Sequence, residues 1–126
     1  MKIKSVSGIV CFVKDIKRTV KFYEFLGLKF KIKEKTRAVG YSNWYWIEFL
    51  TNPAKSQKIF AKDYKAKTKG VGIFTYLSVD DIDKVFKECK SKGIRPLSEP
   101  VETEFGNIEF VIADPDGFKL VLFKRK

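Results

Sequence analysis

The sequence predicts an α+β fold made of two βαβββ modules related by an internal pseudo-two-fold axis. The main observation is a repeat at an offset of 66 residues, which aligns Val13-Lys-Asp-Ile16 with Val79-Asp-Asp-Ile82 and Gly27-Leu28 with Gly93-Ile94. Each half then reads as a strand, an Asp-capped helix, a glycine stop and three further strands. A repeated unit of this kind fits two sheets of four mostly antiparallel strands.

Up to residue 52, the first half is predicted to contain one helix and three of its four strands, with a charged loop at 33–40. Apolar residues recur at helical spacing from Ile16 to Phe25, Asp15 precedes them as a potential N-cap, and Gly27 follows as a stop. Alternating or β-prone residues predict strands at 5–13, 28–32 and 41–50.

A change of composition separates the two halves. Residues 54–69 hold six lysines and little periodicity, so we expect a mobile basic connector with a short strand near 58–61. The second half should contain a helix that is capped by Asp81, reaches Lys92 and ends at Gly93. Its strands are expected at 70–79, from Ile94, at 105–113 and at 118–124.

The last two predicted strands are joined by Asp114-Pro-Asp-Gly117, which has the composition of a tight hairpin turn. Proline presets φ, aspartate accepts hydrogen bonds from nearby amides, and glycine adopts positive φ. The segment Phe118–Phe123 is apolar on both faces except at Lys119, so we expect it in the interior of a sheet.

Length and composition indicate a single globular domain. The chain has 126 residues, of which 44% are hydrophobic, and we place its first half at about 5–52, its connector at 53–69 and its second half at about 70–124. It has no long apolar run and no signal-peptide core at its N-terminus, so we expect no membrane partner and a cytoplasmic location. Cys11 and Cys89 are expected to be buried, reduced thiols.

The formal net charge is +11, from 26 basic and 15 acidic residues, and histidine is absent. A basic chain can bind nucleic acid, a membrane surface or an acidic small molecule. Lysines occur along the whole length, so we favour a solvated lysine-rich surface and do not expect a nucleic-acid partner. The absence of histidine removes the commonest metal ligand and general base.

The chain resembles the vicinal oxygen chelate superfamily, which groups glyoxalase I, bleomycin-resistance proteins, fosfomycin-resistance enzymes and extradiol dioxygenases. The residues that carry this resemblance lie in both halves and follow the order of the family's motifs. They are Val13-Lys-Asp-Ile16 leading to Phe22-Tyr23 and Leu26-Gly27-Leu28, Val79-Asp-Asp-Ile82 leading to Gly93, and Phe105-Gly106 followed by Asp114-Pro-Asp-Gly117. The resemblance implies a fold that hosts many functions.

In the metal-dependent members, one divalent ion is held by ligands at four strand positions. The resemblance places these positions at Gly8, Glu48, Phe74 and Val121, and Gly8 and Phe74 are 66 residues apart, in agreement with the repeat. Only Glu48 carries a ligating atom, whereas a catalytic ion normally takes three or more protein ligands. We therefore expect no metal site and no other cofactor.

The resemblance implies a concave ligand pocket formed by the sheets. Its lining follows from strand parity, because side chains two positions apart share a face. The predicted lining includes Gly8, Val10 and Phe123, together with a set of candidate ligand-binding residues. These candidates are Phe12, Trp44, Trp46, Glu48, Phe74, Tyr76, Lys119 and Val121. An aromatic wall with one acid and one base suits a planar ligand held by stacking. The alternative is that the aromatic residues are ordinary core.

The leading functional hypothesis is a metal-free binding protein of the bleomycin-resistance type that holds a planar aromatic or acidic ligand. The resemblance implies a homodimer, and the charge of +11 favours an anionic ligand. One alternative is a glyoxalase-like isomerase or lyase in which Glu48 is the general base. Another is a basic nucleic-acid-binding module that uses the connector.

Overall fold

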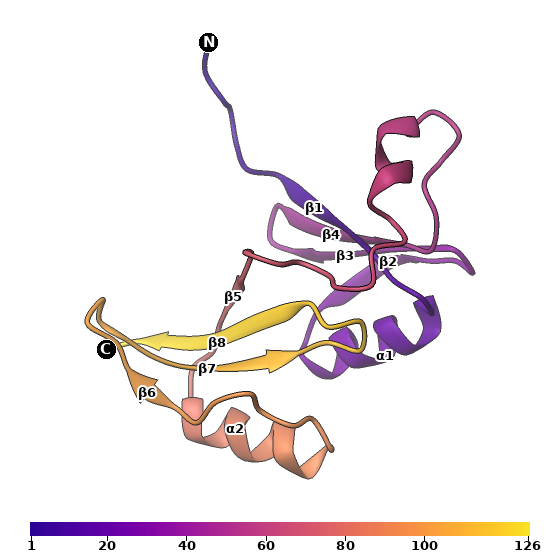
Figure 1. Ribbon diagram of the computed structural model, residues 1–126. Coiled ribbons are helices and arrows are strands. Elements are labelled where there is room, and N and C mark those ends of the chain that lie inside the picture. The colour runs from indigo at the N-terminus through magenta and orange to yellow at the C-terminus, as the bar shows by residue number, and fades with distance from the viewer. The chain divides into compact units, whose positions relative to one another are not determined.

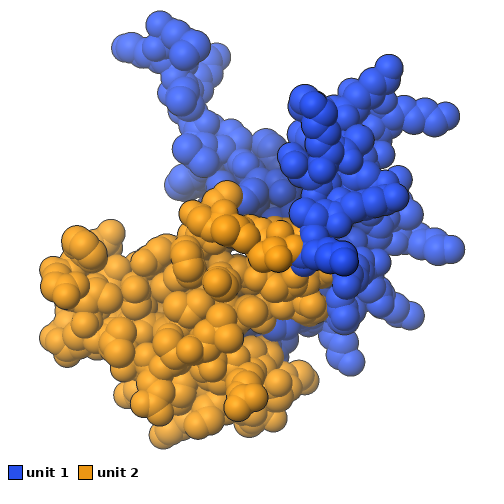
Figure 2. Space-filling view, viewed as in Figure 1, with its two compact units in different colours: residues 1–67 blue, residues 68–126 orange.

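The computed structural model describes all 126 residues, which form two compact units at residues 1–67 and 68–126 (Figure 2). Each unit contains a four-stranded mixed sheet and one α-helix (Figure 1). The predicted α+β fold with two modules of the same topology is confirmed. No helix in the structure combines the length and the apolar character that crossing a membrane requires.

Unit 1 contains the first module and most of the connector. Its sheet has the order β1-β4-β3-β2, in which β1 runs parallel to β4 and the other pairs are antiparallel. Its elements are β1 (Gly8–Phe12), α1 (Ile16–Phe25), β2 (Lys29–Lys33), β3 (Arg37–Ser42), β4 (Tyr45–Leu50) and a 3-10 helix, η1 (Lys58–Lys62).

Unit 2 repeats this topology. Its sheet has the order β5-β8-β7-β6, with β5 parallel to β8 and the other pairs antiparallel. Its elements are β5 (Thr75–Ser78), α2 (Ile82–Ser91), β6 (Val101–Glu102), β7 (Asn107–Ala113) and β8 (Lys119–Arg125). The strand expected in the sheet interior is β8, which lies between β5 and β7.

Both helices begin and end as the repeat predicts. The side chains of Asp15 and Asp81 each accept a hydrogen bond from the backbone N–H three residues later, at 3.3 and 3.1 Å. These bonds satisfy amides that a first helical turn leaves unpaired. Beyond the helices, Gly27 and Gly93 adopt φ values of +100° and +82°, which favour glycine. Local sequence therefore sets both ends of each helix.

Each unit has its own apolar core between helix and sheet. In unit 1 the ring of Tyr23 on α1 lies 4.7 Å from that of Phe49 on β4. In unit 2 the ring of Phe86 on α2 lies 5.2 Å from that of Phe110 on β7. Both cysteines are buried and form no disulfide, as expected, and Cys89 is fully buried.

The hairpin at Asp114 is confirmed. The carboxylate Oδ1 of Asp114 accepts hydrogen bonds from the amides of Asp116 and Phe118, both at 2.9 Å. Its carbonyl accepts from the amide of Gly117 at 3.0 Å, and Gly117 has a φ of +97°. The turn aligns β7 and β8 over their full length.

The prediction of one strand at 41–50, preceded by a loop, is wrong. This stretch is a hairpin in which β3 begins at Arg37 and pairs with β4, with Ser42 opposite Tyr45. The two residues between the strands are Asn43 and Trp44, and Asn43 has a φ of +57°. Asparagine tolerates this conformation better than most residues, so Asn43 marks a two-residue turn.

Three other predicted strands need correction. Residues 58–61 belong to the 3-10 helix η1. The strand expected at 70–79 is shortened to β5, because Gly70 and Gly72 take φ values of +64° and +83° and break the extended backbone. No strand begins at Ile94. The short strand β6 instead lies at Val101–Glu102.

Candidate functional site

Each sheet has a helix-free face, meaning the face opposite its α-helix. In unit 1, Phe49 points toward α1, so its strand neighbours Glu48 and Leu50 point to the helix-free face. The register places Val10 of β1 and Val39 of β3 beside Glu48 on that face. Glu48 therefore lies in the middle of the sheet, with a strand on either side.

The carboxylate of Glu48 is paired with a guanidinium. Arg37 Nε donates a hydrogen bond to Glu48 Oε2 at 2.5 Å, and the side chain of Glu48 is only 18% exposed. This hydrogen bond raises the pKa of Arg37. Sequence reasoning missed Arg37 because it was assigned to a loop. Once the turn at Asn43 is recognised, the hairpin register places Arg37 diagonally across from Glu48.

Trp46 lies across the backbone of Gly8, its partner in the register of β1 and β4. A Cβ atom on Gly8 would lie 2.3 Å from the Trp46 ring, so the missing side chain makes room for the indole. Tyr41 is opposite Trp46 on β3, and the ammonium of Lys31 lies 4.8 Å from the Tyr41 ring centre. Aromatic rings and basic groups thus continue from the Glu48–Arg37 pair toward this end of the sheet.

The connector packs against the helix-free face of unit 1. The rings of Phe60 in η1 and Tyr64 just beyond it each lie 5.8 Å from the ring of Phe12 on β1. Figure 1 shows η1 within the long connection that follows β4. The structure thereby surrounds Phe12, one of the predicted site residues, with aromatic groups from the connector.

Trp44 does not share the position predicted for it. It lies in the turn between β3 and β4 and is 73% exposed, so the parity argument, which holds only within a strand, does not apply. The structure brings together Trp46, Glu48 and Arg37, and it leaves Trp44 at the tip of the hairpin.

In unit 2 the helix-free face carries the four remaining predicted residues. Tyr76 of β5 is paired with Val121 of β8, and the ammonium of Lys119 lies 5.6 Å from the ring centre of Phe74. Val121 is 3% exposed, whereas Phe74 and Tyr76 are about half exposed. The ring of Tyr76 also contacts that of Phe123 at 5.3 Å.

A second carboxylate on this face was not predicted. Tyr76 donates a hydrogen bond to Glu109 Oε1 at 3.4 Å, while Glu109 Oε2 is buried without a hydrogen-bond partner. Burial and the negative charge of Glu109 raise the pKa of Tyr76. A sequence signal existed, because Glu109 lies between Ile108 and Phe110 in a strand whose neighbours are apolar.

The two units carry different chemistry at equivalent positions. Glu48 is paired with Val10, and Val121 is paired with Tyr76, which lies 66 residues after Val10. Glu48 and Val121 therefore occupy the same place in the two sheets. No group of three or more cysteine, aspartate and glutamate side chains is arranged to hold a metal ion, and the chain has no histidine.

Fold and sequence together define the family. The model of the glyoxalase/bleomycin resistance protein/dioxygenase superfamily matches residues 5–122, so the chain belongs to this superfamily. A comparison with curated protein sequences gives no match.

Solved structures share the fold over nearly their whole lengths. A bleomycin resistance determinant encoded on the transposon Tn5 is 20% identical, with a TM-score of 0.68 over 98% of this chain and 99% of that one. A virulence protein from Salmonella typhimurium is 23% identical, with a TM-score of 0.74 and full coverage of both chains. A glyoxalase/bleomycin resistance protein/dioxygenase from Nocardioides is 14% identical, with a TM-score of 0.77 over 99% of this chain and 85% of that one.

Proposed function

We propose that this protein binds a planar aromatic or acidic small molecule on the helix-free faces of its sheets, without a metal ion. The observation that carries the proposal is the arrangement of Glu48, Arg37 and Trp46. A carboxylate in the middle of a sheet is costly to bury unless it is paired or faces a ligand. Here it is paired by a guanidinium and lies in a strand whose helix-free face also carries an indole.

The donor set supports a site without metal. Three of the four positions at which the metal-dependent relatives carry ligands are Gly8, Phe74 and Val121, which offer no ligating side-chain atom. The indole of Trp46 also occupies the space that a side chain at position 8 would need. Glu48 alone is too small a ligand set for a catalytic ion.

The chemistry of the faces favours an anionic aromatic ligand. The rings of Phe12, Tyr41 and Trp46 offer surfaces on which an aromatic ligand can stack. Such contacts bury apolar area and favour particular ring arrangements. Arg37 donates to Glu48 through Nε, and its side chain is 41% exposed, so its remaining N–H groups can serve a carboxylate or phosphate. On the helix-free face of unit 2, the residues proposed to contact a ligand are Phe74, Tyr76, Lys119 and Val121.

The proposal includes a homodimer, because binders of this type in the superfamily work as dimers. Size-exclusion chromatography with light scattering measures this state directly. A monomer at all concentrations would remove the dimer from the proposal and leave the binding chemistry to be tested separately.

An enzyme that uses Glu48 as general base is the second candidate, favoured by the low exposure of this carboxylate. Turnover of a 1,2-dicarbonyl adduct, abolished in Glu48→Gln with the fold intact, would support it. Binding without turnover would support the first candidate.

A thermal-shift screen with EDTA tests the proposal, with divalent metals assayed separately without EDTA. A ligand at 100 times its dissociation constant adds about 2.7 kcal/mol to the free energy of unfolding, a shift on the order of 10 °C at this size. We expect shifts from aromatic carboxylates that are lost in Trp46→Ala and Glu48→Ala. A large shift from Ni²⁺, Zn²⁺ or Mn²⁺ alone would contradict the metal-free site.

A further inference from the structure

The excess of positive over negative charge is confined to one unit of the protein. Residues 1–67 hold 16 lysines and arginines against 5 acidic residues, whereas residues 68–126 hold ten of each. The whole formal charge of +11 therefore belongs to unit 1. A lysine-rich surface that served only solubility would give both units an excess of positive charge. The asymmetry therefore points to a negatively charged partner of unit 1.

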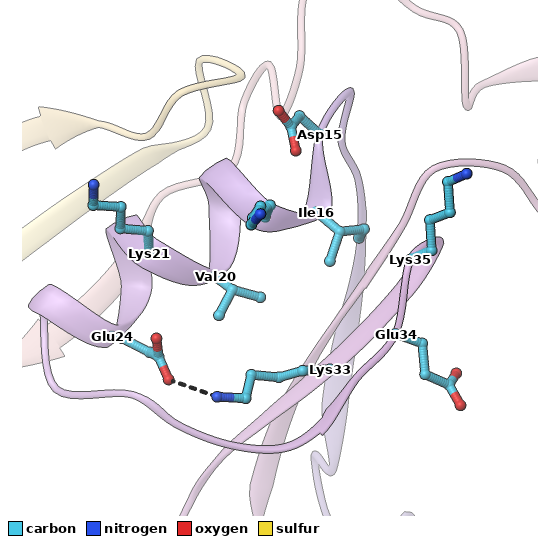
Figure 3. A pocket seen from close by; sticks show the side chains of 9 residues that line it. Asp15, Ile16, Val20, Lys21, Glu24, Lys33, Glu34 and Lys35 are labelled. Atoms are coloured by element: carbon cyan, nitrogen blue, oxygen red, sulfur yellow. Dashed lines mark hydrogen bonds and ion pairs between the residues drawn. The ribbon is translucent and has the colours of Figure 1, made fainter.

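Unit 1 also has a groove between α1 and the turn that joins β2 to β3, with a volume of about 520 Å³. Ile16 and Val20 point from α1 into this space and form an apolar floor (Figure 3). Four lysines line the groove, two from the helix and two from the end of β2 and the turn. These are Lys17, Lys21, Lys33 and Lys35.

Three acidic residues also line the groove; two of them form interactions within unit 1, and the third is turned away (Figure 3). Glu24 forms an ion pair with Lys33 at 3.4 Å, and Asp15 accepts the helix-capping hydrogen bond described above. Glu34 points away from α1 in Figure 3. No ion pair involves the three other lysines of the groove, which are Lys17, Lys21 and Lys35.

We propose that this groove binds the phosphate backbone of a nucleic acid without reading its base sequence. Lysine ammonium groups bind phosphates as point charges, and the groove has no arginine whose planar fork would read a base edge. Contacts of this kind release counterions and supply most of non-specific binding. The sequence alone did not favour this partner, because lysines occur in both halves and no sequence pattern shows that four of them line one groove.

Nucleic acid fits the groove better than a membrane does. Stable binding to a bilayer surface usually combines basic residues with apolar side chains that insert below the headgroups. The large hydrophobic residues that unit 1 exposes are in the N-terminal segment, the hairpin turn and the connector, and none lies on α1 or β2. The groove therefore offers charge without an insertion surface.

The test compares two triple variants that remove the same charge from unit 1. Lys17→Gln, Lys21→Gln and Lys35→Gln change the groove, whereas Lys58→Gln, Lys62→Gln and Lys65→Gln change the connector. Fluorescence anisotropy with a labelled 20-mer oligonucleotide, between 50 and 200 mM salt, gives the slope of log affinity against log salt concentration. We expect the groove variant to lower that slope by about 2–3, because each phosphate contact contributes about 0.7–0.9, and the connector variant to keep it.

Several results would overturn the proposal. These are equal slopes for the two variants, equal affinity of the wild type for polyglutamate, and preferential binding to phosphatidylserine vesicles. Glutamine has nearly the helix propensity of lysine, so both variants should unfold at the wild-type temperature. Trp46→Ala serves as a separate control, and we expect it to bind the oligonucleotide normally, since Trp46 is not among the residues that line the groove.

Discussion

At the scale of single residues, the pair of Gly8 and Trp46 shows how an absent side chain shapes the candidate site. The indole takes the space beside the backbone of Gly8, its partner in the register of β1 and β4. Arg37 then supplies the charge that balances Glu48. These two interactions can be changed one at a time.

Gly8→Ala should displace the indole of Trp46, because the new Cβ would lie 2.3 Å from the ring. Overpacking of this kind costs about 1–3 kcal/mol. Urea denaturation measures that cost, and the emission of Trp46 in a Trp44→Phe background reports the movement of the ring. Unchanged emission and stability would mean that Trp46 does not lie over Gly8.

Burial of Cys89 raises the pKa of its thiol, so the folded state favours the protonated form. The stability from this preference is fully present below the unfolded pKa of about 8.5 and is lost as pH rises through the folded pKa. We expect the wild type to lose more stability than Cys89→Ala between pH 7 and pH 10 in urea titrations. Parallel pH profiles for the two proteins would contradict this.

At the scale of elements, the parts that sequence predicts correctly are those set by local signals. Both helices follow from their aspartate caps, apolar spacing and terminal glycines. The β3–β4 hairpin was missed because Ser42-Asn43 is a weak turn signal inside a β-prone run. The conformation of η1 depends on the packing of Phe60 and Tyr64 against Phe12, which no local pattern reveals.

Asp15→Ala and Asp81→Ala should each lower the free energy of unfolding by about 0.5–2 kcal/mol, because each removes the capping hydrogen bond of one helix. The two caps are in different units, so their effects should add to within about 0.5 kcal/mol. Denaturation of the single and double variants measures this, with Asp→Asn as the control that keeps the cap. A double variant that is no less stable than either single variant would contradict additive effects on the free energy of unfolding.

At the scale of the whole molecule, the repeat preserves the fold while the chemistry of the two units diverges. The register that pairs Glu48 with Val10 in unit 1 pairs Val121 with Tyr76 in unit 2. Lysines occur in both units, but only unit 2 has as many acidic as basic residues. Repetition therefore fixes topology, and individual substitutions give each unit its own surface.

Strand parity predicted part of the candidate site. It put Glu48 on the helix-free face, but it included Trp44, which the turn excludes, and it missed Arg37 and Glu109. Arg37 lies on β3, whose first residues fall in the loop that the sequence predicts at 33–40, and Glu109 lies on β7, next to residues of the predicted apolar strand. Pairing register is a long-range property, so the charged partners of the site could not be assigned from spacing alone.

The most direct test of the central claim is calorimetric titration of a planar aromatic carboxylate, such as naphthoate, in the presence of EDTA. The probe should bind the wild type, lose at least about tenfold in affinity in Arg37→Gln, equivalent to about 1.4 kcal/mol, and bind normally to Arg95→Gln, which removes the same charge from an exposed site in unit 2. Binding that requires added metal, or equal affinity for both variants, would contradict a metal-free site built around Arg37 and Glu48.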